Sequence, residues 1–317
     1  MTRISTLSQN QYILQSTLAT QSRLYDLRRQ LASGNKAADF RDLASQAQSL
    51  SGALTRIARA EQYQANNVQT KAKLTLREAA VREISELAKD LKAQFIEAEG
   101  AEDSRQLQAD AENQLTRLVS ILNSRDQNGN YMFAGSRTNL APVTMTANGA
   151  PPSAFTFTFN NDQVVEQARI DDGLVIDIGV LAGADAATPA AAFAQLFEVL
   201  NYFAAGVYPP PVAGTPAMPQ PGVPPVAGAP AQVIPVINAA LDAVDQLDAA
   251  LGLRLKLLEQ VEVGLQEDVD LTREFAGAIN DADIAEVMTR ISQDEVALEA
   301  SYRITGELRL LSLVEFL

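Results

Sequence analysis

The sequence predicts a mainly α-helical chain with a β-rich insert. Both chain ends are expected to form an elongated antiparallel helical rod with a small β module at its tip. Apolar residues recur every three, four or seven positions through much of 3–124 and 236–317, as in helices that bury one face. Between 129 and about 185 the period changes to two, which is typical of strands. Long helices at the two ends have only each other as partners in one chain, and an antiparallel rod satisfies both.

Three helices are expected before the insert. Residues 3–33 contain no proline or glycine, and Gly34 suits the left-handed position just past a helix end. A second helix is predicted from about 43 to 99, which at 1.5 Å per residue would be roughly 80 Å long. A third is predicted from 103 or 104 to 124, with its leucines on one side.

The stretch NGNYMF (128–133) opens the β-rich segment. Its Asn-Gly pair favours a type I′ turn, whose two central residues take positive φ, and the YMF that follows is suited to a strand. AFTFTFN (154–160) alternates apolar residues with threonine, and RIDDGLVIDIG (169–179) contains an Asp-Gly turn between two strand patterns.

Helix returns after the insert. A short helix is predicted at about 190–205, followed by a chargeless, proline-rich stretch (209–235) that is interpreted as an extended, exposed loop. Long helices are then expected at 236–278 and from 284 to near 317. Asp283 and Glu286 have the spacing of a capping box at the start of the last helix.

These elements predict three domains. Residues 1–42 and 279–317 would form a terminal coiled-coil assembly domain, and 43–128 with 236–278 a helical core of the rod. Residues 129–235 would form an outer β-rich domain with the proline-rich loop.

Composition excludes several classes of function. The chain has no cysteine, histidine or tryptophan, so disulfide frameworks, thiolate nucleophiles and Cys/His zinc sites are excluded. With a net charge of −14 and no basic patch, nucleic acid is not an expected partner. We therefore predict no catalytic, cofactor-binding or metal-binding residues. Neither a cleaved signal peptide nor a transmembrane helix is indicated, so no membrane insertion is expected.

Four local patterns have a functional and a structural interpretation. The acidic run at 280–283 resembles the start of a calcium loop but lacks its glycine and distal glutamate, which favours helix capping. Asp171-Asp172-Gly173 suits a hairpin turn better than an acid–base pair. The stripe at 4–31 lacks the basic face of membrane-surface helices, and the stretch 209–235 lacks the basic flanks of an SH3-type ligand.

Several motifs resemble the flagellin superfamily of bacterial flagellar axial proteins. RIST (3–6), LASGNKAADFRDLA (31–44) and the closing stretch 281–317 are similar to the two ends of superfamily members. NGNYMFAGS (128–136) and the final VEFL resemble its hook–filament junction branch, hook-associated protein 3. The motif positions are Asn128, Gly129, Tyr131, Phe133 and Gly135.

The resemblance implies a structural, non-enzymatic subunit of the bacterial flagellum, with a flagellin-like rod. It would be exported without a cleaved leader by the flagellar type III apparatus and would lie outside the cell, in an adaptor ring joining hook to filament. The implied partners are further copies of the chain, a neighbouring hook-associated protein, flagellin, and an export chaperone at the C-terminal helix.

Narrow apolar stripes at both ends predict where subunits meet, because a single molecule cannot cover them. The residues expected to carry subunit packing are Ile4, Leu7, Leu14, Leu18, Ile291, Leu298, Leu308 and Leu311. A filament flagellin, which would use the same helices, is the first alternative. A carboxylate-dependent hydrolase in the β module, at Asp171 or Asp177, is the second.

Overall fold

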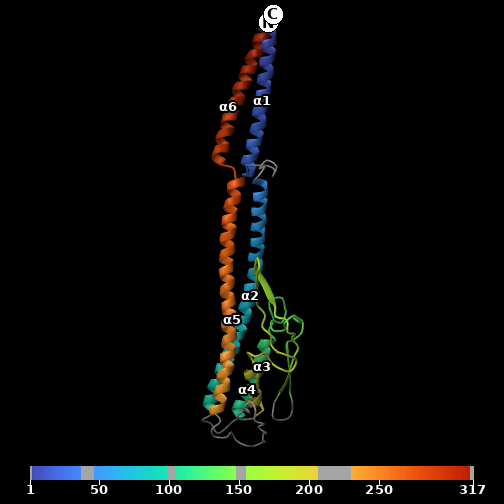
Figure 1. Cartoon of the computed structure of the whole chain (residues 1–317), viewed down its shortest axis with the longest axis vertical. Coiled ribbons are helices and arrows are strands. Elements are labelled where there is room, and N and C mark those ends of the chain that lie inside the picture. Colours follow the sequence, from blue (N-terminus) through green and yellow to red (C-terminus); the bar gives the residue numbers. More distant parts are fainter. Residues whose placement is uncertain (1, 37–45, 99–104, 148–154, 206–229, 315–317) are drawn as a thin grey trace. The chain divides into compact units, whose positions relative to one another are not determined.

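The computed structural model describes residues 2–36, 46–98, 105–147, 155–205 and 230–314 (Figure 1). Within these ranges the chain is mainly α-helical with a small β region, which confirms the expected fold class. The helices are α1 (Thr2–Ser33), α2 (Ala47–Ala98), α3 (Arg105–Leu122), α4 (Ala194–Ala204), α5 (Pro230–Asn280) and α6 (Ile284–Val314). The strands are β1 (Val143–Ala147), β2 (Phe155–Phe159), β3 (Gln167–Asp171) and β4 (Leu174–Asp177).

The chain divides into two compact units. Unit 1 comprises Met1–Glu61 and Gln266–Leu317, and unit 2 comprises Gln62–Leu265. Each division falls inside a long helix, so α2 and α5 contribute residues to both units. The three-domain division expected from the sequence stays a prediction.

In unit 1, α1 and α6 lie side by side and antiparallel (Figure 1). Gln21 contacts Tyr302, and further along α1 Arg28 contacts Glu295, so the partner's number falls as the number on α1 rises. The beginning of α2 packs on the end of α5 through a small apolar cluster. Its members are Leu50, Ala53 and Ala276, with Ile279 packed against them.

In unit 2, charged contacts align α2 antiparallel to α5. Lys71 on α2 lies 3.1 Å from Glu259, and Arg82, further along α2, lies 3.5 Å from Asp248 on α5. Here α2 supplies the cations and α5 the carboxylates, which matches the excess of acidic residues in α5. Such exposed pairs contribute little energy each, but their complementary charges favour this register.

The β region consists of two antiparallel hairpins. In the first, Val143 lies opposite Phe159 at one end and Ala147 opposite Phe155 at the other. In the second, β3 pairs with β4, and Gly173 in the connecting turn takes a positive φ of 83°. The strands expected within 154–160 and 169–179 are thereby confirmed.

Asparagine side chains bind the outer edges of the first hairpin. The Asn123 amide donates to the Val143 carbonyl at 2.8 Å and accepts from the Val143 N–H at 3.0 Å. Asn201 on α4 makes the same two bonds with Phe155, at 3.1 and 2.9 Å. Each amide therefore occupies backbone groups that would otherwise be open to another strand.

One apolar core joins the helices of unit 2 to its β region. The rings of Phe95 on α2 and Phe203 on α4 stack with centroids 5.7 Å apart. At the other end of the contact, the Asn67 side chain on α2 donates to the Ile170 carbonyl of β3 at 3.0 Å. The β module was expected at the tip of the rod. Within unit 2 it packs along α2, whose apolar residues cover the apolar face of the hairpins.

The tight turn of the NGN stretch is one residue earlier than predicted. Gly129 N–H donates to the Asp126 carbonyl at 3.0 Å, so the central residues are Gln127 and Asn128, and the predicted type I′ turn centred on Asn128-Gly129 is wrong. The Asp126 carboxylate explains the shift, since it accepts the N–H of Asn128 and Asn130. Gly129 then takes a φ of 82°, as in three-residue hairpin loops.

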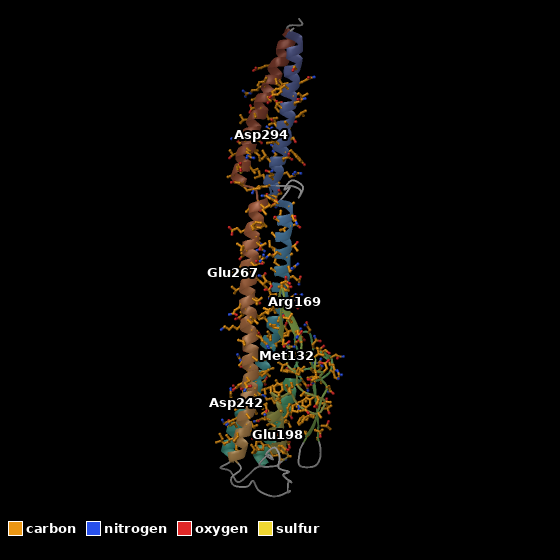
Figure 2. All side chains as sticks on the ribbon, in the orientation of Figure 1. Met132, Arg169, Glu198, Asp242, Glu267 and Asp294 are labelled. Carbon is orange, nitrogen blue, oxygen red and sulfur yellow. The ribbon has the colours of Figure 1, made fainter. Side chains whose placement is uncertain are left out.

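The prediction of a strand at 131–133 is also wrong. Tyr131 makes a single bridge with Arg125, and Met132 and Phe133 lie in turns. Both side chains are nevertheless buried (Met132 is labelled in Figure 2). Their carbonyls accept bonds from outside a sheet, from Arg77 at 3.3 Å and from the Ala182 N–H at 3.1 Å. The apolar residues thus serve the core without a strand partner.

The last two long helices match their predictions apart from one boundary. α5 begins at Pro230 and contains Pro235, so the proline-rich stretch ends earlier than the predicted 235. Pro230 is tolerated at the first position because the first N–H groups have no helical partner, whereas Pro235 lies inside the helix. Residues 209–229 of that stretch lie outside the described residues. Among the described helices, none has the length and apolarity that crossing a membrane requires.

Candidate assembly surface

The inner row of α1 faces α6 and mixes apolar with polar residues. Its members follow steps of four and three along the helix and are buried or half-buried: Ile13, Thr17, Thr20, Leu24 and Leu27. The Thr17 hydroxyl donates to the Ile13 carbonyl at 2.8 Å, and Thr20 bonds Ser16 in the same way. These hydroxyls are satisfied within α1, so they add no bond to α6.

The facing row of α6 has the same mixed character. Val287 is buried, and the residues that continue the row at steps of four and three are half-buried: Ile291, Asp294, Leu298, Ser301 and Thr305. Threonine, serine and aspartate bury less apolar area than leucine, whose full burial contributes about 1.5–3 kcal/mol. The α1–α6 seam is therefore narrow and only partly apolar.

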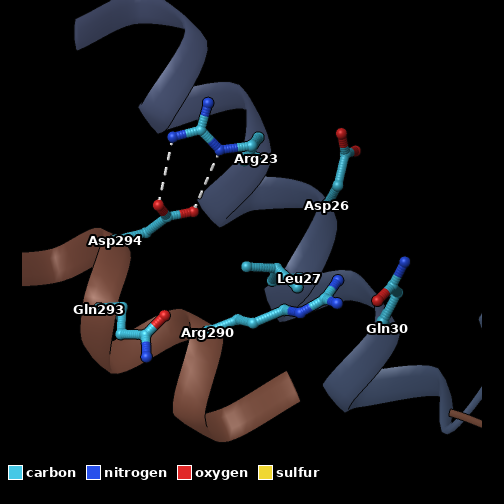
Figure 3. A pocket seen from close by; sticks show the side chains of 7 residues that line it. All are labelled: Arg23, Asp26, Leu27, Gln30, Arg290, Gln293 and Asp294. Atoms are coloured by element: carbon cyan, nitrogen blue, oxygen red, sulfur yellow. Dashed lines mark hydrogen bonds and ion pairs between the residues drawn. The ribbon is translucent and has the colours of Figure 1, made fainter. Parts of the chain in front are cut away.

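Polar contacts flank this seam. The Arg23 guanidinium donates to both carboxylate oxygens of Asp294, at 3.4 and 3.2 Å (Figure 3; Asp294 is also labelled in Figure 2). Arg28 donates to Glu295 at 2.8 Å. The arginines are largely exposed, and such pairs typically contribute at most about 1 kcal/mol each. They fix the register of the two helices more than they stabilise the pair.

A hollow of about 320 Å³ opens beside these contacts, lined by residues of α1 and α6 (Figure 3). Leu27 is its apolar member, and Arg290 extends toward Gln30 across it (Figure 3). The other lining residues are charged or amides: Arg23, Asp26, Gln293 and Asp294. The hollow shows that the two helices do not close on each other along their whole length.

A second row of apolar residues, the outer row, runs along α1 beside the inner row. Leu14 is 61% exposed, Leu18 56% and Tyr25 68%. They are four and seven residues apart and therefore share one face, about 100° around the helix from the inner row. On α6, Met288 and Tyr302 are exposed in the same relation to their inner row. We call Leu14, Leu18, Tyr25, Met288 and Tyr302 the outer rows.

The eight residues predicted to carry subunit packing separate into three groups. Leu14 and Leu18 belong to the outer row of α1, whereas Ile291 and Leu298 lie in the seam between α1 and α6. The side chains of Ile4, Leu7, Leu308 and Leu311 lie outside the described residues. Their role in packing stays a prediction.

Sequence reasoning missed that α1 carries two apolar rows. It treated the apolar residues of 4–31 as one stripe, although the helical angle separates Leu14 and Leu18 from Leu24 and Leu27. It also left out the outer-row tyrosine Tyr25. The signal was present in the spacing, since Leu18 and Tyr25 are seven residues apart.

At the start of α6, Asp283 caps the helix. Its Oδ1 accepts the N–H of Ala285 at 2.9 Å and of Glu286 at 3.1 Å. The Glu286 side chain binds Arg290 one turn on. Capping therefore accounts for Asp283 within the acidic run, and no group of three metal-ligating side chains is found in the described parts of the chain.

A buried arginine that sequence reasoning did not single out fixes the motif turn in unit 2. The Arg77 side chain on α2 is 6% exposed and donates to the carbonyls of Met132 at 3.3 Å and Ile178 at 3.1 Å. It also pairs with Glu166, to which Lys73 donates at 2.6 Å. Burial alone would raise the pKa of Glu166, but the hydrogen bonds and positive charges of the two cations outweigh it and hold that pKa below its usual value.

Gly135 completes this turn. It takes a φ of 67°, and a Cβ there would lie 2.2 Å from the Asp162 carboxylate, which caps the N–H of Ser136 at 2.8 Å. Of the motif positions, Phe133 is buried in the core of unit 2, and Gly129 and Gly135 both have positive φ. The motif therefore builds a turn rather than a chemical site.

The carboxylates of the hydrolase hypothesis do not converge. Asp171 accepts the N–H of Asp172 in its own turn at 2.7 Å, and Asp177 accepts the Gln167 amide at 2.8 Å. The strand register places Asp171 and Asp177 at opposite ends of one hairpin. These contacts provide no acid–base pair.

No protein-family model matches the chain, and no curated protein matches it in sequence. Solved structures do match its fold. A protein assigned as a flagellar hook-associated protein from Vibrio parahaemolyticus aligns with a TM-score of 0.54 and 16% identity, over 73% of this chain and 96% of that one.

Two further solved structures match the fold of the chain. FlgL from Bacillus cereus aligns with a TM-score of 0.50 and 15% identity, over 72% of this chain and 99% of its own. The flagellar junction protein FlgL from Legionella pneumophila aligns with a TM-score of 0.50 and 14% identity, over 71% and 99%. The chain therefore has the fold of FlgL-type flagellar hook-associated proteins.

Proposed function

We propose that the chain is a structural, non-catalytic subunit of the bacterial flagellum, an adaptor at the junction of hook and filament. The observation that carries this proposal is the outer row of α1, in which apolar side chains face solvent while threonines occupy the seam. Exposed apolar side chains that share one helix face indicate a surface that another molecule covers. The shared fold with FlgL-type proteins supports a flagellar setting for that surface.

In this proposal copies of the chain form a ring through α1 and α6. The ring contacts a neighbouring hook-associated protein on one side and flagellin on the other. The subunit leaves the cell unfolded through the flagellar type III apparatus, and a chaperone covers α6 before export. The absence of cysteine is compatible with that route, since no disulfide closes a loop in the threading chain.

The proposal is tested first with Leu18→Glu. A carboxylate on the outer row leaves the free subunit folded, because Leu18 is exposed, but it has to be buried at a subunit contact. We expect the variant to be secreted and to fail to restore motility in a strain that lacks the chain. The matched control is Gln15→Glu, which adds the same charge at another exposed position of α1.

If Leu18→Glu restores motility as well as the control does, the outer row is not an assembly surface. Removal of residues 284–317 gives a coarser form of the test. A truncated chain that still joins the axial structure would exclude assembly through α6.

A filament flagellin remains the alternative, since it would use the same outer rows. The position of a labelled copy on intact flagella separates the two. One spot at the end of the hook is expected for the junction protein, whereas signal along the whole length would establish the filament subunit and refute the junction role.

A further inference from the structure

The turn at 126–130 contains the pair Asn128-Gly129, which the proposed assembly surface does not include. Asparagine is one of the thermolabile residues of proteins, because its side-chain amide reacts with the backbone nitrogen that follows it. Glycine in the next position favours this reaction, since without a side chain its nitrogen approaches the amide carbon closely. Asn128 and Gly129 are both exposed, so water reaches the pair.

The reaction available to this pair is a cyclisation followed by hydrolysis. The Gly129 nitrogen gives up its proton and forms a bond to Cγ of Asn128. The bond from Cγ to the side-chain nitrogen breaks, and that nitrogen takes up the proton and leaves as ammonia. Solvent water then opens the cyclic imide at either carbonyl, which yields aspartate or isoaspartate. The product carries an added negative charge at neutral pH.

The folded turn restrains the nitrogen that would have to react. Gly129 N–H donates to the Asp126 carbonyl at 3.0 Å, so its proton is held and the nitrogen is directed toward Asp126. Cyclisation requires this bond to break, because the nitrogen has to turn toward the Asn128 side chain. A second backbone bond closes the same loop, since Asp126 N–H donates to the Asn130 carbonyl at 2.8 Å.

The Asp126 carboxylate fixes the chain on both sides of the reacting pair. Its Oδ1 accepts the N–H of Asn128 at 2.8 Å and of Asn130 at 2.9 Å. Burial alone would raise the pKa of Asp126, but the hydrogen bonds from Asn130 and Asn128 outweigh it and hold that pKa below its usual value. The carboxylate is therefore ionised at neutral pH, and its negative charge opposes loss of the proton from the Gly129 nitrogen.

We propose that Asn128 is a deamidation site that the folded turn protects through the hydrogen bonds of Asp126. The reaction proceeds from the open turn, so its rate follows the fraction of molecules in which the turn is open. Isoaspartate adds a methylene to the backbone before Gly129, so the Gly129 N–H no longer meets the Asp126 carbonyl and the turn stays open. The proposal concerns the subunit by itself and does not depend on the proposed function.

The test compares the folded full chain with the same chain in guanidinium chloride, at one pH and one temperature. Trypsin cuts after Arg125 and Arg137, and fragmentation of peptide 126–137 in the mass spectrometer distinguishes Asn128 from Asn130. We expect Asn128 to deamidate at least about tenfold more slowly in the folded chain, which corresponds to about 1.4 kcal/mol for opening the turn. Equal rates would refute protection by the fold. An Asn128 that stays unmodified in guanidinium chloride would refute the site.

The role of Asp126 is tested with Asp126→Ala, which removes the carboxylate and keeps the backbone carbonyl. We expect Asn128 to deamidate about fivefold faster in this folded variant than in the folded wild type. Asp185→Ala is the matched control, because Asp185 caps another turn of unit 2 by accepting the N–H of Ala187 at 2.8 Å and of Thr188 at 2.7 Å. An unchanged rate in Asp126→Ala, or an equal acceleration in Asp185→Ala, would refute protection by Asp126.

Hydrogen exchange measures what the modification does to the turn. Anion exchange separates the deamidated chain by its added charge. In the isoaspartate form, the amides of Gly129 and Asn130 should exchange at least about tenfold faster than in the unmodified chain. Asn128→Asp adds the charge without the methylene and should exchange like the wild type. Unchanged exchange in the isoaspartate form, or equally fast exchange in Asn128→Asp, would refute the effect assigned to the methylene.

Discussion

Units 1 and 2 contain segments of the same two long helices, yet they bury their apolar residues differently. In unit 2, Leu74, Ile84 and Phe95 of α2 are fully buried under α3, α4 and the β region. In unit 1, Leu14 and Leu18 are exposed while neighbouring threonines fill the seam. Unit 2 buries a large core within one chain, although Val68 and Leu253 stay exposed in it. In the described part of unit 1 the core is small, and exposed apolar side chains lie beside a partly polar seam.

The difference shows that the length of a helix does not decide whether its apolar faces are buried within one chain. An antiparallel pair of helices covers only one face of each, so further elements have to cover the rest. Unit 2 has them, since the insert supplies α4 and two hairpins. The β-rich insert therefore stabilises the long helices as well as adding an outer surface.

The largest loss of stability is expected from a substitution in the core of unit 2. Phe95→Ala removes a fully buried ring that stacks on Phe203, and substitutions of this kind cost about 3–5 kcal/mol. Leu14→Ala, at an exposed position of unit 1, should change the free energy of unfolding by less than about 0.5 kcal/mol. Urea unfolding of the free subunit measures both, and equal losses would contradict the comparison.

The second effect concerns the buried Arg77. Arg77→Met keeps the length of the side chain but removes the donors to Met132 and Ile178 and leaves Glu166 with Lys73 as its charged donor. Unsatisfied buried groups each cost about 1–3 kcal/mol, so we expect a loss on the order of 3 kcal/mol. Faster hydrogen exchange should accompany it in the turn at 129–136. Unchanged exchange there would show that Arg77 does not hold the turn.

Sequence reasoning found the helices, the second hairpin and one strand of the first, β2, because their periods differ, whereas β1 (Val143–Ala147) was not predicted. Seven-residue repeats in α1 and α5 and the alternation in 154–160 are local patterns, which burial on one face makes visible. The YMF run misled because the carbonyls of Met132 and Phe133 bond to distant groups, Arg77 and the Ala182 N–H, instead of to a neighbouring strand, and no local pattern reveals those partners.

The candidate surface was only partly predictable. The sequence places apolar residues on α1, but which of them α6 covers depends on how α1 is rotated about its axis. That rotation was not predictable because the buried row of α1 contains threonines, which a search for apolar residues passes over. Leu14 and Leu24 looked equivalent in spacing, although one is exposed and the other buried. The bridge between Asn35 and Asp281 was missed because the two residues are far apart in sequence and pair through backbone groups.

An intermediate effect is expected at the motif glycines. Gly135→Ala places a Cβ 2.2 Å from the Asp162 carboxylate at a positive φ, so we expect a loss of about 2 kcal/mol. Gly129→Ala has the same backbone conformation but open space around it, and about 1 kcal/mol from the backbone alone is expected. Thermal unfolding ranks the two variants. A larger loss at Gly129 would mean that the Asp162 contact does not constrain the turn.

A pH-dependent effect should be specific to unit 2. Because the pKa of Glu166 is lowered in the folded chain, its ion pairs contribute stability above the ordinary pKa of 4.5. That contribution disappears as the pH falls through the lowered value. The stability gap between the wild type and Glu166→Gln should therefore be largest near neutral pH and shrink below about pH 4.5. Urea unfolding over a pH series measures this gap, and a constant gap would contradict the coupling.

The smallest effect is a gain of stability, expected from a substitution in unit 1. Gly52 lies within α2 in unit 1, and a Cβ there meets no atom within 4 Å, so Gly52→Ala should stabilise the free subunit by about 0.5–1 kcal/mol. In unit 2, Gly183→Ala should destabilise instead, since its Cβ would lie 2.4 Å from the side chain of Phe159. Thermal unfolding of the two variants provides the measurement. The two changes in the free energy of unfolding should have opposite signs, because helix propensity dominates at an exposed position and packing dominates in a core. A loss of stability in Gly52→Ala would show that this face of unit 1 is already covered.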